Sequence, residues 1–203
     1  MAEHCKLIET DTRTEFVEIE NGNKALIFEE KPQEMKCRVI GSYSENNQSY
    51  DVDCEIGCES LEEMKRCRKQ MVLSFASDYS IPGFSCGFIG EDEVDIFRLM
   101  VCGTGFYSHF SINEMSRHQL SGLANQILDF KKRCFPAANT INGRILIHGG
   151  LQTGWEDIEP LFYMFIQTCS IKEANVQFYF NEDVPLRFID IDIWLYPAKD
   201  NNE

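Results

Sequence analysis

Alternating apolar and polar residues in the first sixty positions predict paired β-strands. Residues 15–20 (EFVEIE) and 24–29 (KALIFE) flank the short turn Asn21-Gly22-Asn23, whose glycine can adopt a positive φ. Two further runs, residues 35–42 and 49–57, flank a polar stretch. The pattern therefore predicts two β-hairpins.

The last of these runs separates two kinds of side chain. Its even positions are apolar and the three odd positions between them are acidic, and side chains alternate between the two faces of a strand. We therefore expect a half-buried strand with an acidic outer face. The apolar set is Tyr50, Val52, Cys54 and Ile56, and the acidic set is Asp51, Asp53 and Glu55.

Two segments have the spacing of amphipathic helices. Ser60 with Glu63 forms a capping box, and apolar residues follow at helical spacing in Leu61, Met64 and Met71. A second helix is predicted over residues 111–134, with Ser111 or Asn113 as its N-cap and an end before Pro136. Its apolar stripe is Met115, Leu120, Leu123, Ala124, Ile127, Leu128 and Phe130.

The remaining segments read as further strands. Residues 84–89 and 94–102 flank an acidic turn, and residues 144–148 form a short strand that ends at Gly149-Gly150. Residues 161–169, 175–181 and 186–196 predict a three-stranded meander. In its last strand Asp190, Asp192 and Trp194 share one face.

These elements predict an α+β fold, with about eight to ten antiparallel strands packed against two amphipathic helices. A chain of 203 residues is within the size that one such domain reaches. We expect a single globular domain over residues 1–203, with a frayed tail at 199–203.

The excess of acidic residues limits the kinds of molecule that the protein is expected to bind. The chain has 33 acidic and 19 basic residues, a formal net charge of -14, which repels nucleic-acid phosphate and anionic lipid. It favours encounter with a basic protein, although acidity also simply aids solubility. Because of this charge we expect no direct nucleic-acid binding. No apolar run is long enough to span a membrane, so we expect no membrane binding either.

Cysteine usage favours a reduced, cytoplasmic protein. The nine cysteines are odd in number and scattered, and no signal-peptide core precedes them. Cys54, Cys86, Cys102 and Cys169 lie in apolar or strand-like runs, where a free thiol acts as a small hydrophobe. Cys54 and Cys58, with Cys67 further on, come closest to a zinc pattern, but no C-x-x-C pair is present, so we predict buried thiols and no metal.

Searches for catalytic sets give no assignment. No local signature joins His109, His118 or His148 to a nucleophile, and Ser85 in GFSCG lacks the βαβ context of a nucleophile elbow. The glycine motifs lack phosphate-loop spacing, so no cofactor is predicted. The carboxylates on each acidic strand lie about 7 Å apart, which suits a glycosidase or a divalent cation, but also a solvated sheet face or a partner-binding surface.

The order of elements resembles small immunity proteins that neutralise bacterial polymorphic toxins. The likeness covers the last half of the chain: residues 111–134 (SINEMSRHQLSGLANQILDFKKRC), 143–149 (GRILIHG) and the closing run IDIDIWLYPA. It implies a non-catalytic, acidic protein that blocks a toxin by covering its active site.

The predicted function is therefore stoichiometric binding of a basic partner, of which a toxin domain is one class. One alternative is a small cytosolic hydrolase that uses strand-borne carboxylates or a cysteine with His109 or His148. Another is a structural or scaffold subunit, and the oligomeric state is left open. The expected partner contacts are Asp51, Asp53, Glu55, Glu91, Asp92, Glu93, Asp190, Asp192 and Trp194.

Overall fold

The computed structural model describes most of the chain as two compact units. Unit 1 holds the described residues up to Tyr107, and unit 2 holds those from Ser108 onward. The single domain predicted over residues 1–203 thus contains two units, and its folding as one cooperative domain stays a prediction. The described residues are 5–18, 22, 24–45, 48–78, 100, 103–112, 117–137, 140–150, 153, 155–180 and 189–198.

The α+β class predicted from the sequence is correct. The nine described strands follow the order β1-β2-β3-β4-β5-β6-β9-β7-β8, and both predicted helices are present. The expectation of purely antiparallel pairing is wrong, because β5 pairs with β6 and β7 with β8 in parallel. The described residues also contain a third helix.

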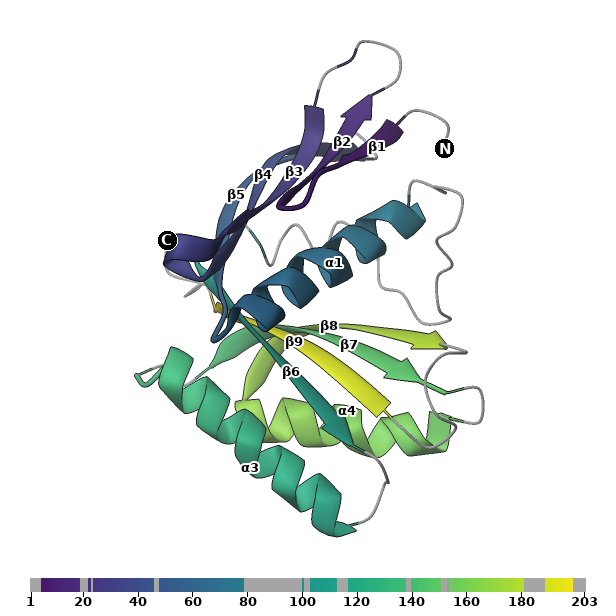
Figure 1. Cartoon of the computed structure of the whole chain (residues 1–203). Helices are drawn as coiled ribbons and strands as arrows, with labels where there is room; N and C mark the ends of the chain where they lie inside the picture. Colours follow the sequence, from purple (N-terminus) through teal and green to yellow (C-terminus); the bar gives the residue numbers. More distant parts are fainter. Residues whose placement is uncertain are drawn as a thin grey trace. The chain divides into compact units, whose positions relative to one another are not determined.

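Unit 1 is built from consecutive hairpins. Each of its first five strands pairs antiparallel with the next, which confirms both predicted hairpins, and Gly22 has the expected positive φ of 69°. Figure 1 shows these strands with the helix α1 beside them. The bounds are β1 Cys5–Glu9, β2 Arg13–Glu18, β3 Lys24–Lys31, a 3-10 turn Pro32–Glu34, β4 Lys36–Glu45, β5 Gln48–Gly57 and α1 Leu61–Asp78.

The helix α1 begins as its capping signal predicts. The Glu63 N–H donates to Ser60 Oγ at 3.1 Å, and the Glu63 carboxylate accepts from the Glu59 N–H at 2.9 Å. Met64 and Met71 are buried, whereas Leu61, expected in the same stripe, is 50% exposed. The buried face packs on β3 and β4, which supply Leu26, Phe28, Cys37 and Val39 to the core of unit 1.

An ion pair ties α1 to the sheet beneath it. The Arg68 Nε donates to Glu30 Oε1 at 2.7 Å, and the Glu30 side chain is 1% exposed. The other guanidinium nitrogens donate to Thr14 Oγ1 at 2.7 Å and to the Asp11 carbonyl at 3.0 Å. A buried carboxylate is tolerated only when it is paired in this way, so Arg68 fixes where the helix lies on β2 and β3.

We expect Arg68→Ala to lower the free energy of unfolding by about 3 kcal/mol, because it leaves Glu30 buried without its cation. Urea denaturation measures the change. The exposed neighbour Lys69 is the control, and Lys69→Ala should change stability by no more than about 0.5 kcal/mol. Equal effects of the two substitutions would contradict the role of the pair.

Unit 2 has β7 at the centre of its last three strands. β9 pairs with β7 in antiparallel orientation along one edge, and β8 pairs with it in parallel along the other. The predicted meander is therefore wrong. The bounds are β6 Gly105–Ile112, which begins in unit 1 and continues into unit 2, α3 Arg117–Cys134, β7 Ile141–Gly149, α4 Trp155–Cys169, β8 Ile171–Phe180 and β9 Ile189–Pro197.

The helix α4 replaces the strand predicted over residues 161–169. Its buried residues are Ile158, Leu161, Phe165 and Cys169, spaced three or four apart as on one face of a helix. The helical spacing could not be recognised in the sequence, because a short and almost continuous apolar run is compatible with a helix and with a buried strand. A helix here also supplies the crossover that joins the parallel strands β7 and β8.

One face of the unit 2 sheet packs on both helices. α3 and α4 lie side by side beneath it (Figure 1), and Phe110 of β6 meets Phe130 of α3 edge to face, with ring centroids 6.3 Å apart. Leu123 and Ile127 of the predicted α3 stripe are buried. However, α3 begins at Arg117, and Ser111 lies in β6, so the predicted capping role of Ser111 is wrong.

Candidate functional site

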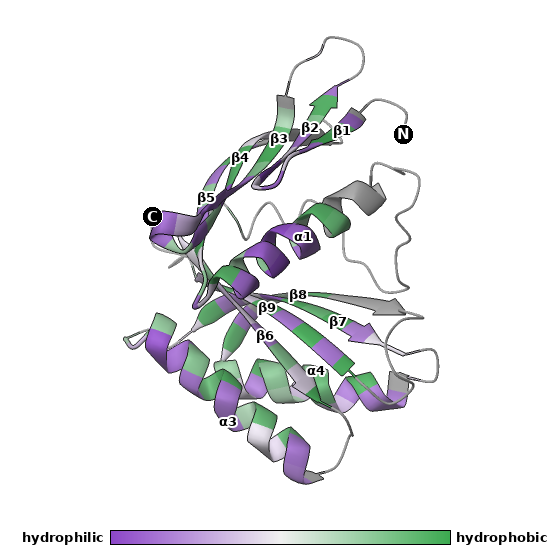
Figure 2. Cartoon of the chain, in the orientation of Figure 1, coloured by the Kyte–Doolittle hydropathy of each residue, from purple (hydrophilic) through white to green (hydrophobic). Residues whose placement is uncertain are grey.

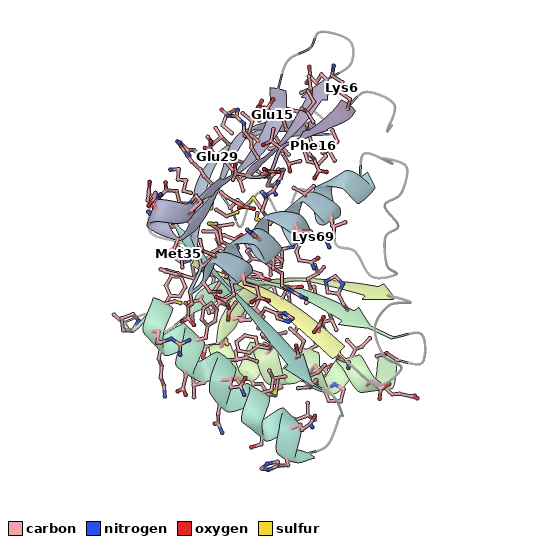
Figure 3. The ribbon with its side chains drawn as sticks, viewed as in Figure 1. Lys6, Glu15, Phe16, Glu29, Met35 and Lys69 are labelled. Carbon is pink, nitrogen blue, oxygen red and sulfur yellow. The ribbon has the colours of Figure 1, made fainter. Side chains whose placement is uncertain are left out.

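The acidic residues of β5 lie on the solvent side of unit 1. Val52, Cys54 and Ile56 are buried, whereas Asp51 and Asp53 are exposed and Glu55 is half-buried, as the alternation predicts. Figure 3 shows Glu15 and Glu29 of the neighbouring strands on the face turned away from α1, opposite Phe16. We call this side the outer face of unit 1.

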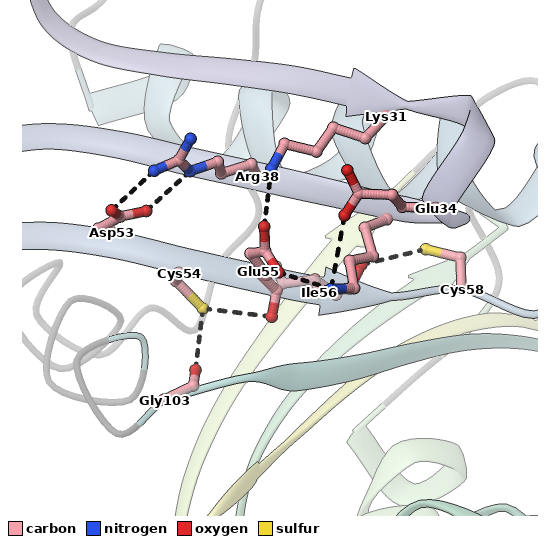
Figure 4. Close-up of polar contacts among 10 residues, drawn as sticks. Lys31, Glu34, Arg38, Asp53, Cys54, Glu55, Ile56, Cys58 and Gly103 are labelled. Atoms are coloured by element: carbon pink, nitrogen blue, oxygen red, sulfur yellow. Dashed lines mark hydrogen bonds and ion pairs between the residues drawn. The ribbon is translucent and has the colours of Figure 1, made fainter.

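Cations from the adjacent strands neutralise much of the outer face. Glu55 accepts from Lys31 Nζ and from Lys36 Nζ, each at 2.7 Å. Asp53 receives two hydrogen bonds from the Arg38 guanidinium, both at 2.8 Å (Figure 4). The sequence showed the carboxylates, but the cations come from strands that only the register brings beside them.

Strand register explains this pairing. Arg13 lies opposite Glu29, Glu29 opposite Arg38, and Arg38 opposite Glu55, so positive and negative residues alternate across four strands. Opposite charges at such positions stabilise a sheet. The outer face therefore carries both signs, and within the described residues Asp51 has no ion-pair partner.

These hydrogen bonds also lower the pKa values of the paired carboxyl groups. Hydrogen bonds from Lys31 and Lys36 lower the pKa of Glu55 to about 2. The Arg38 hydrogen bonds lower the pKa of Asp53 as well. Each carboxylate is thus held in its charged form across the physiological range of pH.

Because the pKa of Glu55 is depressed in the folded state, its pairing stabilises the protein above the ordinary glutamate pKa of 4.5 and is lost as pH falls toward 2. We expect Glu55→Gln to be less stable than the native chain at pH 7, by about 1 kcal/mol for such surface pairs. Chemical denaturation across this range of pH measures the difference, which should shrink steadily below pH 4.5. A constant difference would contradict the assignment.

In unit 2, the alternation along β9 divides apolar from polar residues, as Figure 2 shows. Ile191 and Ile193 point to the side of Ile147 and Ile145, their partners on β7. Asp190, Asp192 and Trp194 occupy the other side, where β7 contributes Arg144 and His148 opposite Trp194 and Asp190. His109 and Ser111 join them from β6.

These side chains form a continuous polar cluster, the β6–β7–β9 cluster, defined as His109, Ser111, His148, Asp190 and Asp192. Ser111 Oγ is 3.1 Å from His109 Nε2 and donates to Asp190 Oδ1 at 2.9 Å. On its other side, His109 Nδ1 is 3.4 Å from Asp192 Oδ1. His148 Nε2 is 3.2 Å from the second Asp192 oxygen.

Burial increases through the cluster. Ser111 is exposed, the His109 side chain is 22% exposed, and Asp192 is fully buried. Trp194 is also fully buried, beneath the Arg144 guanidinium at 5.2 Å. The expectation that Asp192 and Trp194 form part of an outer contact surface is therefore wrong, because both side chains are buried. Asp190 keeps a side-chain exposure of 19%.

Ser111, the exposed member of this cluster, is a candidate functional residue that the sequence patterns did not single out. Ser111 was interpreted as a helix cap, although in GFYSHFSI it follows His109 by two positions and so shares its side of a strand. That spacing was the available signal. Asp190 and Asp192 are about eighty positions away in the chain, and only strand pairing brings them to the histidine.

The predicted acidic turn residues Glu91, Asp92 and Glu93 lie outside the described residues, as do the predicted strand 84–89 and the cysteines Cys86 and Cys102. Of the strand predicted over residues 94–102, only Met100 is described, and it is helical. The role of the three acidic turn residues as contacts stays a prediction.

Cys37, Cys54 and Cys67 of unit 1 are buried, as predicted for Cys54 and Cys67, whereas Cys58 is half-buried. Cys54 Sγ donates to the Gly103 carbonyl at 3.2 Å (Figure 4), and burial raises the pKa of Cys67 well above its ordinary value. Free thiols include Cys37, Cys54, Cys58, Cys67, Cys134 and Cys169. Within the described residues, no group of histidine, cysteine and acidic side chains is arranged to hold a metal ion.

Comparison with known proteins identifies no family. No family model and no curated protein matches the chain. Similar solved structures include the FtsZ W319Y mutant from M. jannaschii (11% identity, TM-score 0.41, 66% of this chain and 40% of that one) and the empty FtsZ dimer from M. jannaschii (8%, 0.43, 68% and 40%). GDP-bound CetZ1 from Haloferax volcanii is another (12%, 0.35, 71% and 42%).

The chain thus spans about two fifths of the length of these structures.

Among the helices that the structure describes, none has the length and apolar character needed to cross a membrane.

Proposed function

We propose that the protein acts by binding a basic protein partner through the outer face of unit 1, and that toxin domains are one class of such partners. The observation that carries this proposal is the exposure of Asp51, which has no ion-pair partner among the described residues, next to the exposed ion pair of Asp53 with Arg38. Asp53 keeps a side-chain exposure of 59% beside Arg38, and Asp51 is exposed. The net charge of -14 adds a long-range field of the same sign.

The outer face suits exchange of ion pairs. Exposed pairs contribute only about 0.2–1 kcal/mol, so a partner's arginine or lysine can replace Arg38 at Asp53 at little cost and can add a new pair at Asp51. The alternating row from Arg13 to Glu55 also repels a wrongly placed cation. Such surface charges act mainly on the association rate and on specificity.

The test is binding of purified basic nuclease-toxin domains, with association rates measured by surface plasmon resonance and toxin inhibition measured by nuclease assay. We expect one-to-one complexes whose association slows with added salt. The double variant Asp51→Asn/Asp53→Asn should associate about 3- to 10-fold more slowly. In the matched control, Glu156→Gln/Glu159→Gln removes two exposed charges from α4 and should have a much smaller effect.

Absence of a complex with every basic domain would overturn the proposal. So would equal slowing by the two double variants, because it would show that total charge acts rather than the outer face.

A further inference from the structure

The β6–β7–β9 cluster places a hydroxyl, an imidazole and a carboxylate in the order that a nucleophilic site requires. Ser111 Oγ faces His109 Nε2 at 3.1 Å, and the opposite ring nitrogen, Nδ1, faces Asp192 at 3.4 Å. In this order the histidine can take the hydroxyl proton while the carboxylate orients the ring and stabilises its charged form. We infer that unit 2 hydrolyses esters, with Ser111 as nucleophile and His109 as general base.

Burial assigns each member its role. An attacking group must be reachable, and Ser111 is exposed. The orienting carboxylate must be shielded, and Asp192 is fully buried. His109 Nδ1 is itself buried, and 3.4 Å exceeds a formed hydrogen bond. Such contacts commonly shorten when substrate binds.

His148 is a second positioning residue. Its Nε2 lies 3.2 Å from the Asp192 oxygen that does not face His109. Asp192 is thereby contacted from both β6 and β7, which limits rotation of the carboxylate. The two histidines thus contact one carboxylate through different oxygens, and only His109 reaches Ser111.

Asp190 determines the charge of the substrate. In the resting state its Oδ1 accepts the Ser111 hydroxyl at 2.9 Å and lies 3.5 Å from His109 Nε2. A negative charge this close to the attacking oxygen repels an anionic substrate and attracts a cationic one. The site is therefore suited to neutral or cationic esters.

The reaction has two balanced steps. The Ser111 hydroxyl first turns from Asp190 Oδ1 to His109 Nε2. Ser111 Oγ then forms a bond to the ester carbonyl carbon and passes its proton to His109, the carbon–oxygen bond to the leaving alcohol breaks, and His109 returns the proton to that alcohol. Water then attacks the acyl-serine, gives a proton to His109, and releases the carboxylic acid while Ser111 regains its proton. No oxidant, reductant or further reactant is needed.

A fluorophosphonate probe tests the nucleophile directly, because the serine oxygen displaces fluoride from phosphorus and His109 takes the proton. We expect one label on the native chain, mapped to Ser111 by peptide mass spectrometry. Ser111→Ala should remove it, and His109→Gln should slow labelling at least about 100-fold, the usual contribution of a general base. Ser42→Ala, which removes another exposed strand serine, is the matched control and should label as the native chain does.

Ester turnover tests the charge selection. The native chain should hydrolyse acetylcholine and 4-nitrophenyl acetate faster than an anionic 4-nitrophenyl ester, and Asp190→Asn should raise the rate with the anionic ester relative to the cationic one. Far-UV circular dichroism checks that each variant is folded, and Ser111→Ala changes only one exposed hydroxyl.

Absence of label on the native chain, label retained in Ser111→Ala, or undiminished labelling of His109→Gln would each overturn the inference. It does not rest on the proposed partner binding. Ser111→Ala should still bind a basic partner, and Asp51→Asn/Asp53→Asn should still react with the probe.

Discussion

The burial of the Asp192 charge is the constraint on which the polar side of unit 2 depends. A carboxylate removed from water is costly unless polar groups surround it, and here imidazoles from two different strands approach both of its oxygens. The positions of β6, β7 and β9 are thus coupled through one side chain. Without these contacts, the alternation along β9 would bury the Asp192 carboxylate without polar neighbours.

In unit 1, by contrast, the charged side chains lie near solvent and pair with opposite charges on neighbouring strands. Its carboxylates remain close to water, and the row from Arg13 to Glu55 alternates in sign across four strands. A net charge summed over the sequence therefore describes the far field of the molecule and not the local surface. Close to the sheet, the surface presents both signs of charge on neighbouring strands.

The elements that depend only on residues close together in the sequence were predicted correctly. The capping box at Ser60 and the turn at Gly22 needed no distant information, and both were found. The helix α4 was missed because its apolar run suits two periods, and the parallel pairing of β7 with β8 follows from that helix. The cluster around Asp192 was missed because its members meet only through the register of strands separated by long stretches of chain, which no local pattern encodes.

The place of β9 in the strand order has a consequence for synthesis. β9 lies between β6 and β7, although both are made well before it. A ribosome-bound chain that has not yet extruded residues 189–197 must therefore hold these two strands with unsatisfied backbone edges. Until β9 is inserted, β6 and β7 have no strand between them. The nascent chain is therefore open to chaperone binding or edge-to-edge association for longer than a protein whose neighbouring strands are also consecutive in the sequence.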